Sequence, residues 1–170
     1  MKEADKSPEA VEPSSGQSRP NRETRYQGAI VRDHHIMLLF GREDWGDGPR
    51  EFWLLPGGGI EPGETAEEAV RREMLEETKL EVRVERLLLD RPPHPSDSGP
   101  YKRVVTYLCT PLGGEAAPGV EPEMSPAVWV ILDVCWFDLR DERGWGEAIL
   151  KNPITYDQLV EIRRQLGYLD

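Results

Sequence analysis

The sequence predicts a mixed α/β fold. Several short segments rich in Val, Ile and Leu have the composition of strands, and only two segments, far apart in the chain, show apolar side chains at helical spacing. A chain of 170 residues is also long enough to bury one substantial core. We therefore expect a single domain at residues 23–170. The Pro-, Ser-, Glu- and Lys-rich residues 1–22 predict a disordered tail, with a cloning remnant as the alternative.

The first half of the domain begins with a predicted hairpin. Residues 28–32 and 36–40 are apolar strands, and the polar sequence Asp-His-His at 33–35 predicts the turn between them. A flexible loop at 45–49 precedes a short apolar strand at 52–55, which runs into a proline and three glycines. Glycines allow the backbone to approach a ligand closely, so this loop is a candidate wall of a site.

The first helix is predicted to begin near Thr65. Thr65 and Glu68 have the Ser/Thr-x-x-Glu form of a capping box, which satisfies free amides at a helix N-terminus. On a helical wheel, one side carries Ala66, Ala69, Val70, Met74, Glu73, Glu76 and Glu77. The opposite side carries Glu67, Glu68 and Arg71, and these are the residues that we expect to face solvent.

The second half of the domain contains the remaining predicted elements. Strands are expected at 82–89 and 104–110, and two short apolar stretches at 127–132 and 134–139 flank Asp133. Long loops rich in Pro, Gly and Glu occupy 91–100 and 113–126. The second helix is predicted from about Thr155 to Leu166, with Gly167 marking its end.

Composition and charge exclude several classes of function. The net charge of −11 argues against a general nucleic-acid-binding surface, which needs a basic patch. Two cysteines, Cys109 and Cys135, lie in apolar runs and predict buried free thiols rather than a disulfide framework. The chain has no apolar run long enough to span a membrane and no signal-peptide core, so a cytoplasmic protein is the default expectation.

Three carboxylates on the predicted inward side of the first helix are the strongest functional signal. Glu73, Glu76 and Glu77 lie at i, i+3 and i+4, on the same side as Val70 and Met74. Ordinary surface glutamates are the alternative, but those would face solvent with Glu67 and Glu68. Carboxylates this close repel one another, so either a cation lies among them or one of them is protonated. Mg²⁺ prefers such oxygen ligands, and the spacing therefore predicts a divalent-cation site.

Residues 58–80 resemble the Nudix box, G-x5-E-x7-R-E-U-x-E-E-x-G-U, in which U is an aliphatic residue. Its fixed letters are matched by Gly58, Glu64, Arg72, Glu73, Glu76 and Glu77, and its aliphatic positions by Met74 and Leu80. The preceding WLLPGGG at 53–59 is similar to the strand and loop that enter the box, and the resemblance extends over most of residues 24–168. It implies a Nudix-type α/β/α sandwich with a mixed β-sheet.

The resemblance also implies an activity. A Nudix hydrolase uses Mg²⁺ or Mn²⁺ to hydrolyse the diphosphate bond of a nucleoside diphosphate linked to another moiety X, such as a nucleoside triphosphate, nucleotide sugar or dinucleotide. One alternative is a catalytically silent nucleotide-binding domain that acts as a sensor or scaffold. Diphosphate isomerisation or mRNA-cap hydrolysis on the same fold is another, although the negative charge opposes RNA as a partner. We expect a small-molecule nucleotide-type substrate and no membrane partner, and a homodimer is one option for assembly.

Roles within the box follow from the same resemblance. The expected metal ligands are Glu73, Glu76, Glu77 and a backbone carbonyl of Gly58 or Gly59. Arg72 would orient a ligand glutamate, and Glu64 would be structural or auxiliary. The catalytic set is therefore Arg72, Glu73, Glu76 and Glu77. The general base is left open between Glu76 or Glu77 and a loop glutamate, Glu121 or Glu123.

Substrate recognition lies outside the box. The basic residues that could hold phosphate oxygens are Arg42, Arg50, Lys102 and Arg103. Trp45, Trp53 and Tyr101 could stack on a base. Pro95 resembles a subgroup feature of ADP-ribose hydrolases, but its neighbours are also prolines, so it does not select a substrate.

One letter of the box departs from the pattern, because Lys79 stands where the box has Gly. Gly suits a left-handed residue at a helix C-terminus, where any other residue costs on the order of 1 kcal/mol. Lys79 could adopt that conformation with strain, or it could keep ordinary helical angles. In either case the glutamates upstream keep their spacing, so we expect activity to survive.

Overall fold

The computed structural model describes residues 23–170, and the tail predicted at 1–22 lies outside the described residues. The elements are β1 (Thr24–Arg32), β2 (His35–Glu43), β3 (Arg50–Leu54), β4 (Gly57–Gly58), α1 (Ala66–Thr78), β5 (Glu81–Arg91), β6 (Arg103–Gly113), β7 (Trp129–Asp138), a 3₁₀ turn (Glu142–Gly144), α2 (Glu147–Leu150) and α3 (Pro153–Gln165). The predicted α/β class is confirmed.

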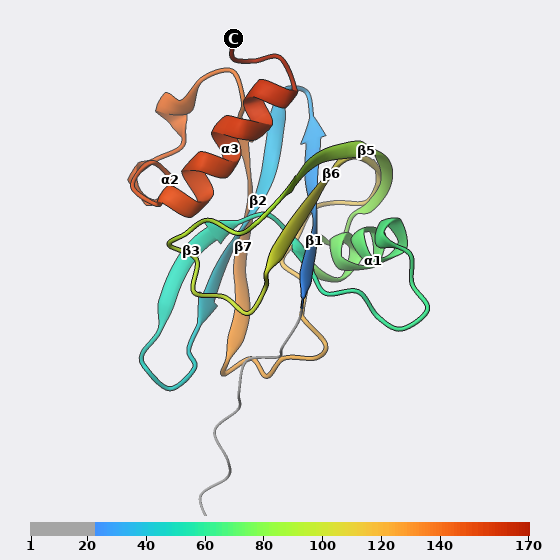
Figure 1. Ribbon diagram of the computed structural model, residues 1–170, viewed down its shortest axis with the longest axis vertical. Helices are drawn as coiled ribbons and strands as arrows, with labels where there is room; N and C mark the ends of the chain where they lie inside the picture. The colour runs from blue at the N-terminus through green and yellow to red at the C-terminus, as the bar shows by residue number, and fades with distance from the viewer. Residues whose placement is uncertain (1–22) are drawn as a thin grey trace, which may run out of the picture.

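The sheet is mixed, as the resemblance implied. Its strands follow the order β3-β2-β1-β6-β5, with β4 paired to β1 and β7 paired to β2. Strands β1 and β6 are parallel, and the other pairs are antiparallel. Helix α1 lies on one side of the sheet and α3 on the other (Figure 1).

Alternation along the central strands builds a core on each face of the sheet. Ala29 and Leu38 pack with α2 and α3, in a cluster that includes Leu159. Their neighbours Ile30 and Met37 face the other way and pack against Val70, Met74 and Leu80 of the α1 side. Both faces are therefore covered by helices, which is the α/β/α sandwich.

The hairpin between β1 and β2 is tighter than predicted. Asp33 and His34 both have positive φ, 48° and 64°, and His35 is already the first residue of β2. Positive φ at both central residues matches the twist of a two-residue hairpin, and Asp tolerates it better than most residues. The predicted position of the turn is confirmed, with one residue fewer.

The last strand differs from the prediction. The two apolar stretches around Asp133 form one strand, β7, because a bulge absorbs the irregularity. Phe40 of β2 pairs with Asp133 and Gly41 pairs with Ile131, so Leu132 is the additional residue. Asp133 itself lies at the surface, where its carboxylate accepts a bond from the amide of Val134. An exposed acidic residue can therefore remain within a strand.

Helix α1 begins with the predicted cap, whereas α3 begins earlier than predicted. Thr65 and Glu68 form the capping box before α1. The residue after α1, Lys79, has φ 64° and ψ 8°, so it adopts the left-handed conformation, and its amide donates to the carbonyl of Leu75. Helix α3 begins at Pro153, two residues before the predicted start, because the side chain of Asn152 caps it. The short α2 was not predicted, since four residues carry too little periodicity.

The conformation of Lys79 makes a stability prediction. Lys79→Gly should raise the free energy of unfolding by about 0.5–1 kcal/mol, because glycine has no Cβ to strain a left-handed residue. Lys79→Ala is the matched control, since it removes the charge but keeps the Cβ, and it should bring no such gain. Urea unfolding of the three proteins measures the difference. A glycine variant less stable than the alanine variant would contradict this account of the turn.

Candidate metal site and the adjoining cavity

The site begins with two buried carboxylates on α1. Glu73 and Glu77 are 1% and 2% exposed, on the same side of the helix as Met74. Strand β4 covers them: the amide of Gly57 donates to Glu77 Oε2 at 2.8 Å, and the carboxylate of Glu73 lies where a side chain at position 58 would be. A Cβ at position 58 would therefore displace this carboxylate, and glycine leaves it in place.

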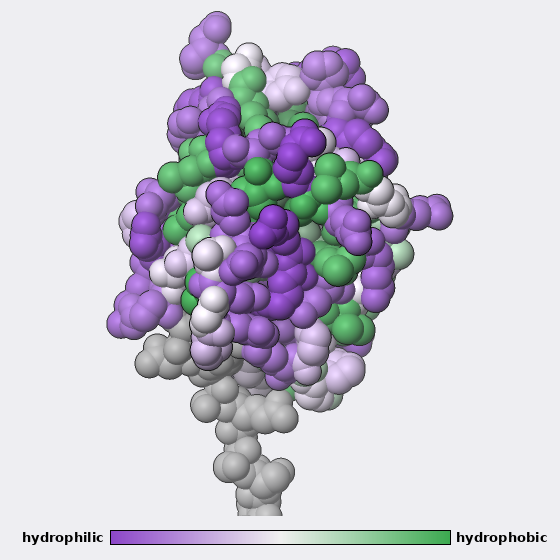
Figure 2. All heavy atoms as spheres, turned by 90° about the vertical axis from the view of Figure 1, so that its right-hand side faces the viewer, coloured by the Kyte–Doolittle hydropathy of each residue, from purple (hydrophilic) through white to green (hydrophobic). Residues whose placement is uncertain are grey.

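The outward side of the helix is exposed, as the wheel predicted. Glu67, Glu68 and Arg71 all face solvent. The view from the α1 side of the molecule shows a mostly hydrophilic lower part, with apolar side chains gathered in a band across the upper half (Figure 2). The buried position of Glu73 and Glu77 is thus a specific feature and not a general property of the helix.

A third carboxylate completes the cluster. Glu121, from the loop between β6 and β7, joins Glu73 and Glu77, and one oxygen from each of the three lies within 4.8 Å of the others. Glu73 Oε2 is buried and has no hydrogen-bond partner among residues 23–170. Buried polar atoms are almost always partnered. An oxygen-only donor set with one orphaned oxygen fits a hard divalent cation such as Mg²⁺ or Mn²⁺.

Burial and mutual repulsion make the cluster unfavourable when it is charged. Burial raises the pKa of Glu73 to about 7, and the negative charge of Glu121 adds to the effect. Burial also raises the pKa of Glu77 well above its usual range, with a further contribution from Glu73. A cation at the centre would reverse both effects, because it favours the ionised carboxylates.

Arg72 holds the rim of the cluster together. Its guanidinium binds both oxygens of Glu64, at 2.6 and 3.0 Å, in a bidentate pair. It also donates to Glu73 Oε1 at 2.9 Å, to Glu76 Oε2 at 3.3 Å and to the carbonyl of Gly59 at 3.0 Å. The hydrogen bond from Arg72 lowers the pKa of Glu64. One arginine therefore links the glycine loop, the loop before α1 and two helix glutamates.

The structure brings together some of the predicted ligands and separates others. Glu76 lies outside the trio and is paired with Arg72, and the carbonyl of Gly59 already accepts from the same arginine. Their ligand roles, and that of the Gly58 carbonyl, stay predictions. Glu121 was expected only as a candidate base. Sequence could not rank it among the ligands, because its neighbours in the fold are more than 40 positions away along the chain.

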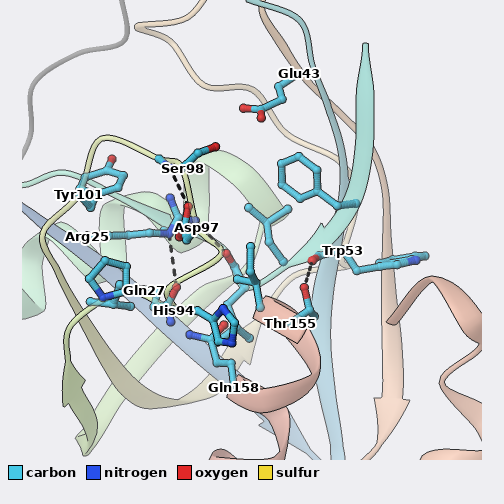
Figure 3. Close-up of a pocket in the computed structure, with 18 of the residues that line it drawn as sticks. Arg25, Gln27, Glu43, Trp53, His94, Asp97, Ser98, Tyr101, Thr155 and Gln158 are labelled. Atoms are coloured by element: carbon cyan, nitrogen blue, oxygen red, sulfur yellow. Dashed lines mark hydrogen bonds between the residues drawn. The ribbon is translucent and has the colours of Figure 1, made fainter. Parts of the chain in front are cut away.

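A cavity of about 610 Å³ opens beside the cluster, and both Glu77 and Glu121 line it. Arg25, Gln27 and Tyr101 lie on one side of this cavity, and Trp53 and Glu43 on the other (Figure 3). The loop at 92–102 forms part of its wall and is tied to α3 by His94, whose Nε2 lies 3.2 Å from Asp157 Oδ2.

Only some of the predicted substrate-binding residues line this cavity. Arg50 lines it, as do the aromatic residues Trp45, Trp53 and Tyr101. The lining does not include Arg42, Lys102 or Arg103. Lys102 instead lies 3.1 Å from Glu23, and Arg103 forms an ion pair with Asp90.

Two further arginines of the cavity had no sequence signal. Arg25 donates to the carbonyl of Leu55 at 2.9 Å, and its charge opposes the rise in the pKa of Glu77. Arg91 is half-buried at the end of β5, lines the cavity and makes no side-chain hydrogen bond or ion pair with any residue of 23–170. Arg25 lies near the start of β1 and Arg91 at the end of β5. The order of the strands in the sheet brings these two ends to the same cavity.

Comparison with known proteins gives one consistent picture. The sequence profile described as NUDIX domain matches residues 23–153. A MutT-like protein of Streptomyces ambofaciens is 32% identical over 109 residues, covering 61% of each chain. An ADP-ribose pyrophosphatase of Methanocaldococcus jannaschii is 35% identical over 92 residues, covering 54% of this chain and 53% of that protein. The matched region therefore spans about half to three-fifths of these curated relatives.

A solved structure supports the same fold. The MutT NUDIX hydrolase from Burkholderia pseudomallei superimposes with a TM-score of 0.54 at 27% identity, covering 84% of this chain and 97% of that chain.

Within residues 23–170, no helix combines the length and apolarity that crossing a membrane would need.

The buried trio predicts a specific response to metal. Mn²⁺ should raise the melting temperature of the protein, because a ligand that binds only the folded state stabilises it by about 2.7 kcal/mol at 100 times its Kd. Glu77→Gln should melt at the same or a higher temperature without metal, since a buried charge is gone, and should lose most of the Mn²⁺ response. Glu67→Gln, on the exposed side of α1, is the control and should keep that response. A full Mn²⁺ shift in Glu77→Gln would contradict the site.

Proposed function

Because this chain belongs to the NUDIX domain family, we propose that it is a pyrophosphohydrolase that uses Mg²⁺ or Mn²⁺ to cleave the diphosphate bond of a nucleoside diphosphate linked to another moiety X. One observation carries the proposal: three carboxylates converge, one of them with an orphaned buried oxygen, and two of the three, Glu77 and Glu121, line a cavity of about 610 Å³. A diphosphate brings negative charge, and a bound cation makes that charge compatible with an acidic wall.

Glu73, Glu77 and Glu121 would hold the cation. When bound, a divalent ion neutralises the diphosphate and lowers the pKa of water. Arg72 keeps Glu73 in place through its bond at 2.9 Å, and Gly57 does the same for Glu77 at 2.8 Å. Ligands fixed in this way need no rearrangement when the cation arrives.

The chemical step needs an acceptor for one proton. The oxygen of a water molecule forms a bond to phosphorus, the bond from that phosphorus to the bridging oxygen breaks, and the bridging oxygen leaves with its electron pair on the other phosphate. The proton of the water goes to a carboxylate, which acts as general base. We assign this role to the oxygen of Glu121 that would not hold the cation, because Glu121 lines the cavity and is less buried than Glu73 and Glu77. Glu76 does not line the cavity.

The cavity also supplies groups for binding the substrate. Arg25, Arg50 and Arg91 are its arginines, and guanidinium groups match phosphate oxygens in geometry and charge. Phe52, Trp45 and Trp129 offer aromatic faces for a base. The small nucleotide-type substrate expected from sequence is consistent with these groups, whereas the cytoplasmic location and the homodimer stay predictions.

Turnover tests the function directly. Release of phosphate or of nucleoside monophosphate from nucleotides, nucleotide sugars and dinucleoside polyphosphates should require Mg²⁺ or Mn²⁺. Glu77→Gln and Glu121→Gln should each lower kcat by about 10²–10³, the usual cost of losing one electrostatic stabiliser, while Glu67→Gln stays near wild type. Nucleotide binding without turnover in any metal would favour the silent binding domain. Near-wild-type kcat in both cluster variants would reject the assignment of the site.

The cavity arginines make a prediction about substrate binding. Arg91→Gln should raise KM about tenfold or more, because a hydrogen bond between charged groups contributes about 1.5–3 kcal/mol. Arg42→Gln is the matched control, since Arg42 is exposed and outside the cavity lining, and its KM should not change. Steady-state kinetics on the best substrate of the screen measures both. An equal rise in the two variants would show that the cavity does not select the substrate.

A further inference from the structure

The loop after β6 is attached to the C-terminus of α1 by its backbone. The amides of Ala117, Gly119 and Val120 donate to the carbonyls of Thr78, Glu77 and Glu76, at 3.0, 2.9 and 3.0 Å. These carbonyls belong to the last turn of α1, where no amide within the helix is available to them. The loop therefore caps the end of the helix that carries the metal site.

Gly119 makes this attachment possible. A Cβ at position 119 would lie 2.7 Å from the carbonyl carbon of Glu76 and 3.0 Å from that of Glu77, and it would overlap the carbonyl oxygen of Glu76. All three are backbone atoms of a helix and cannot move aside. The φ of Gly119 lies outside the left-handed region, so the need for glycine here is close approach and not backbone conformation.

Glu121 lies two residues beyond this contact. The residue before it, Val120, donates its amide to the carbonyl of Glu76, and after it the amide of Met124 donates to the carbonyl of Glu121 at 3.1 Å. The backbone carbonyls of Glu76 and Glu77 thus accept hydrogen bonds from the loop. The carboxylate of Glu77 lies close to the carboxylate of Glu121. The register of the loop on the helix determines where the third carboxylate lies.

We propose that Gly119 is a positioning residue for the metal site: its contact with the C-terminal carbonyls of α1 places Glu121 beside Glu73 and Glu77. The inference rests on the proposed metal site and assigns a role to a residue outside the box. A methyl group at position 119 lifts the loop from the helix and withdraws Glu121. The two helix carboxylates then hold the cation without their third partner.

The test compares Gly119→Ala with Gly113→Ala. At position 113, the last residue of β6, a Cβ meets nothing within 4 Å and φ is not left-handed, so this variant introduces the same methyl group just before the loop without a clash. Electron paramagnetic resonance of free Mn²⁺ measures the Kd. Gly119→Ala should bind Mn²⁺ roughly 10- to 100-fold more weakly, the usual cost of losing a group that orients a ligand, and Gly113→Ala should bind like wild type.

A double mutant separates positioning from general destabilisation. If Gly119 acts through Glu121, then Gly119→Ala combined with Glu121→Gln should bind Mn²⁺ no more weakly than Glu121→Gln alone. Additive losses would overturn the inference, as would wild-type affinity in Gly119→Ala. These results are distinct from failure of the proposed function, in which the unaltered protein would bind no Mn²⁺ or would bind it equally well after Glu77→Gln.

A measurement on the unaltered protein covers the case in which Gly119→Ala does not fold. Amide hydrogen exchange of Gly119 and Val120 should slow at least severalfold when Mg²⁺ binds, because a held Glu121 holds the adjacent backbone on α1. The same amides in Glu121→Gln should not respond to Mg²⁺. Exchange that is unchanged by Mg²⁺ in the unaltered protein, while Mg²⁺ raises its melting temperature, would overturn the positioning role.

Discussion

Glu73 and Glu77 are two carboxylates buried side by side, and the organisation of the site follows from the cost of burying them. An unpaired buried charge costs several kcal/mol, and two of like sign also repel. Arg72 offsets part of this cost for Glu73, and the amide of Gly57 does so for Glu77. Part of the cost is not offset, because the buried Oε2 of Glu73 has no hydrogen-bond partner among residues 23–170. A divalent cation bound there would satisfy that oxygen and stabilise the fold together with the site.

Helix α1 serves the core and the site with the same face. Met74 packs against the sheet between the positions of Glu73 and Glu77, so the helix cannot rotate to expose the carboxylates without losing its core contacts. Backbone approaches α1 closely at two places, and at each a Cβ would clash with atoms of the helix residues. Gly58 admits the carboxylate of Glu73, and Gly119 admits the carbonyls at the end of the helix. Packing thus enforces a charge arrangement that electrostatics alone would oppose.

Local signals in the sequence predicted local structure well. The capping box at Thr65, the left-handed option at Lys79 and the inward side of α1 all depend on residues within one or two turns, and the structure confirms them. The partners of α1 could not be predicted in the same way. Glu121 reaches the cluster through backbone bonds between distant segments, and Arg91 reaches the cavity through the order of strands in the sheet. Neither residue belongs to a periodic pattern, and neither has a neighbour in the sequence, that would predict such a contact.

Diffraction from crystals soaked in Mn²⁺ tests the central claim most directly, because anomalous scattering locates the ion without reference to activity. The account predicts a peak at coordination distance, about 2.0–2.2 Å, from carboxylate oxygens of Glu73, Glu77 and Glu121, since hard divalent cations bind oxygen at such distances. An ion held by Glu76 and the glycine-loop carbonyls with Glu121 turned away would contradict it. So would an empty cluster at a Mn²⁺ concentration that supports turnover.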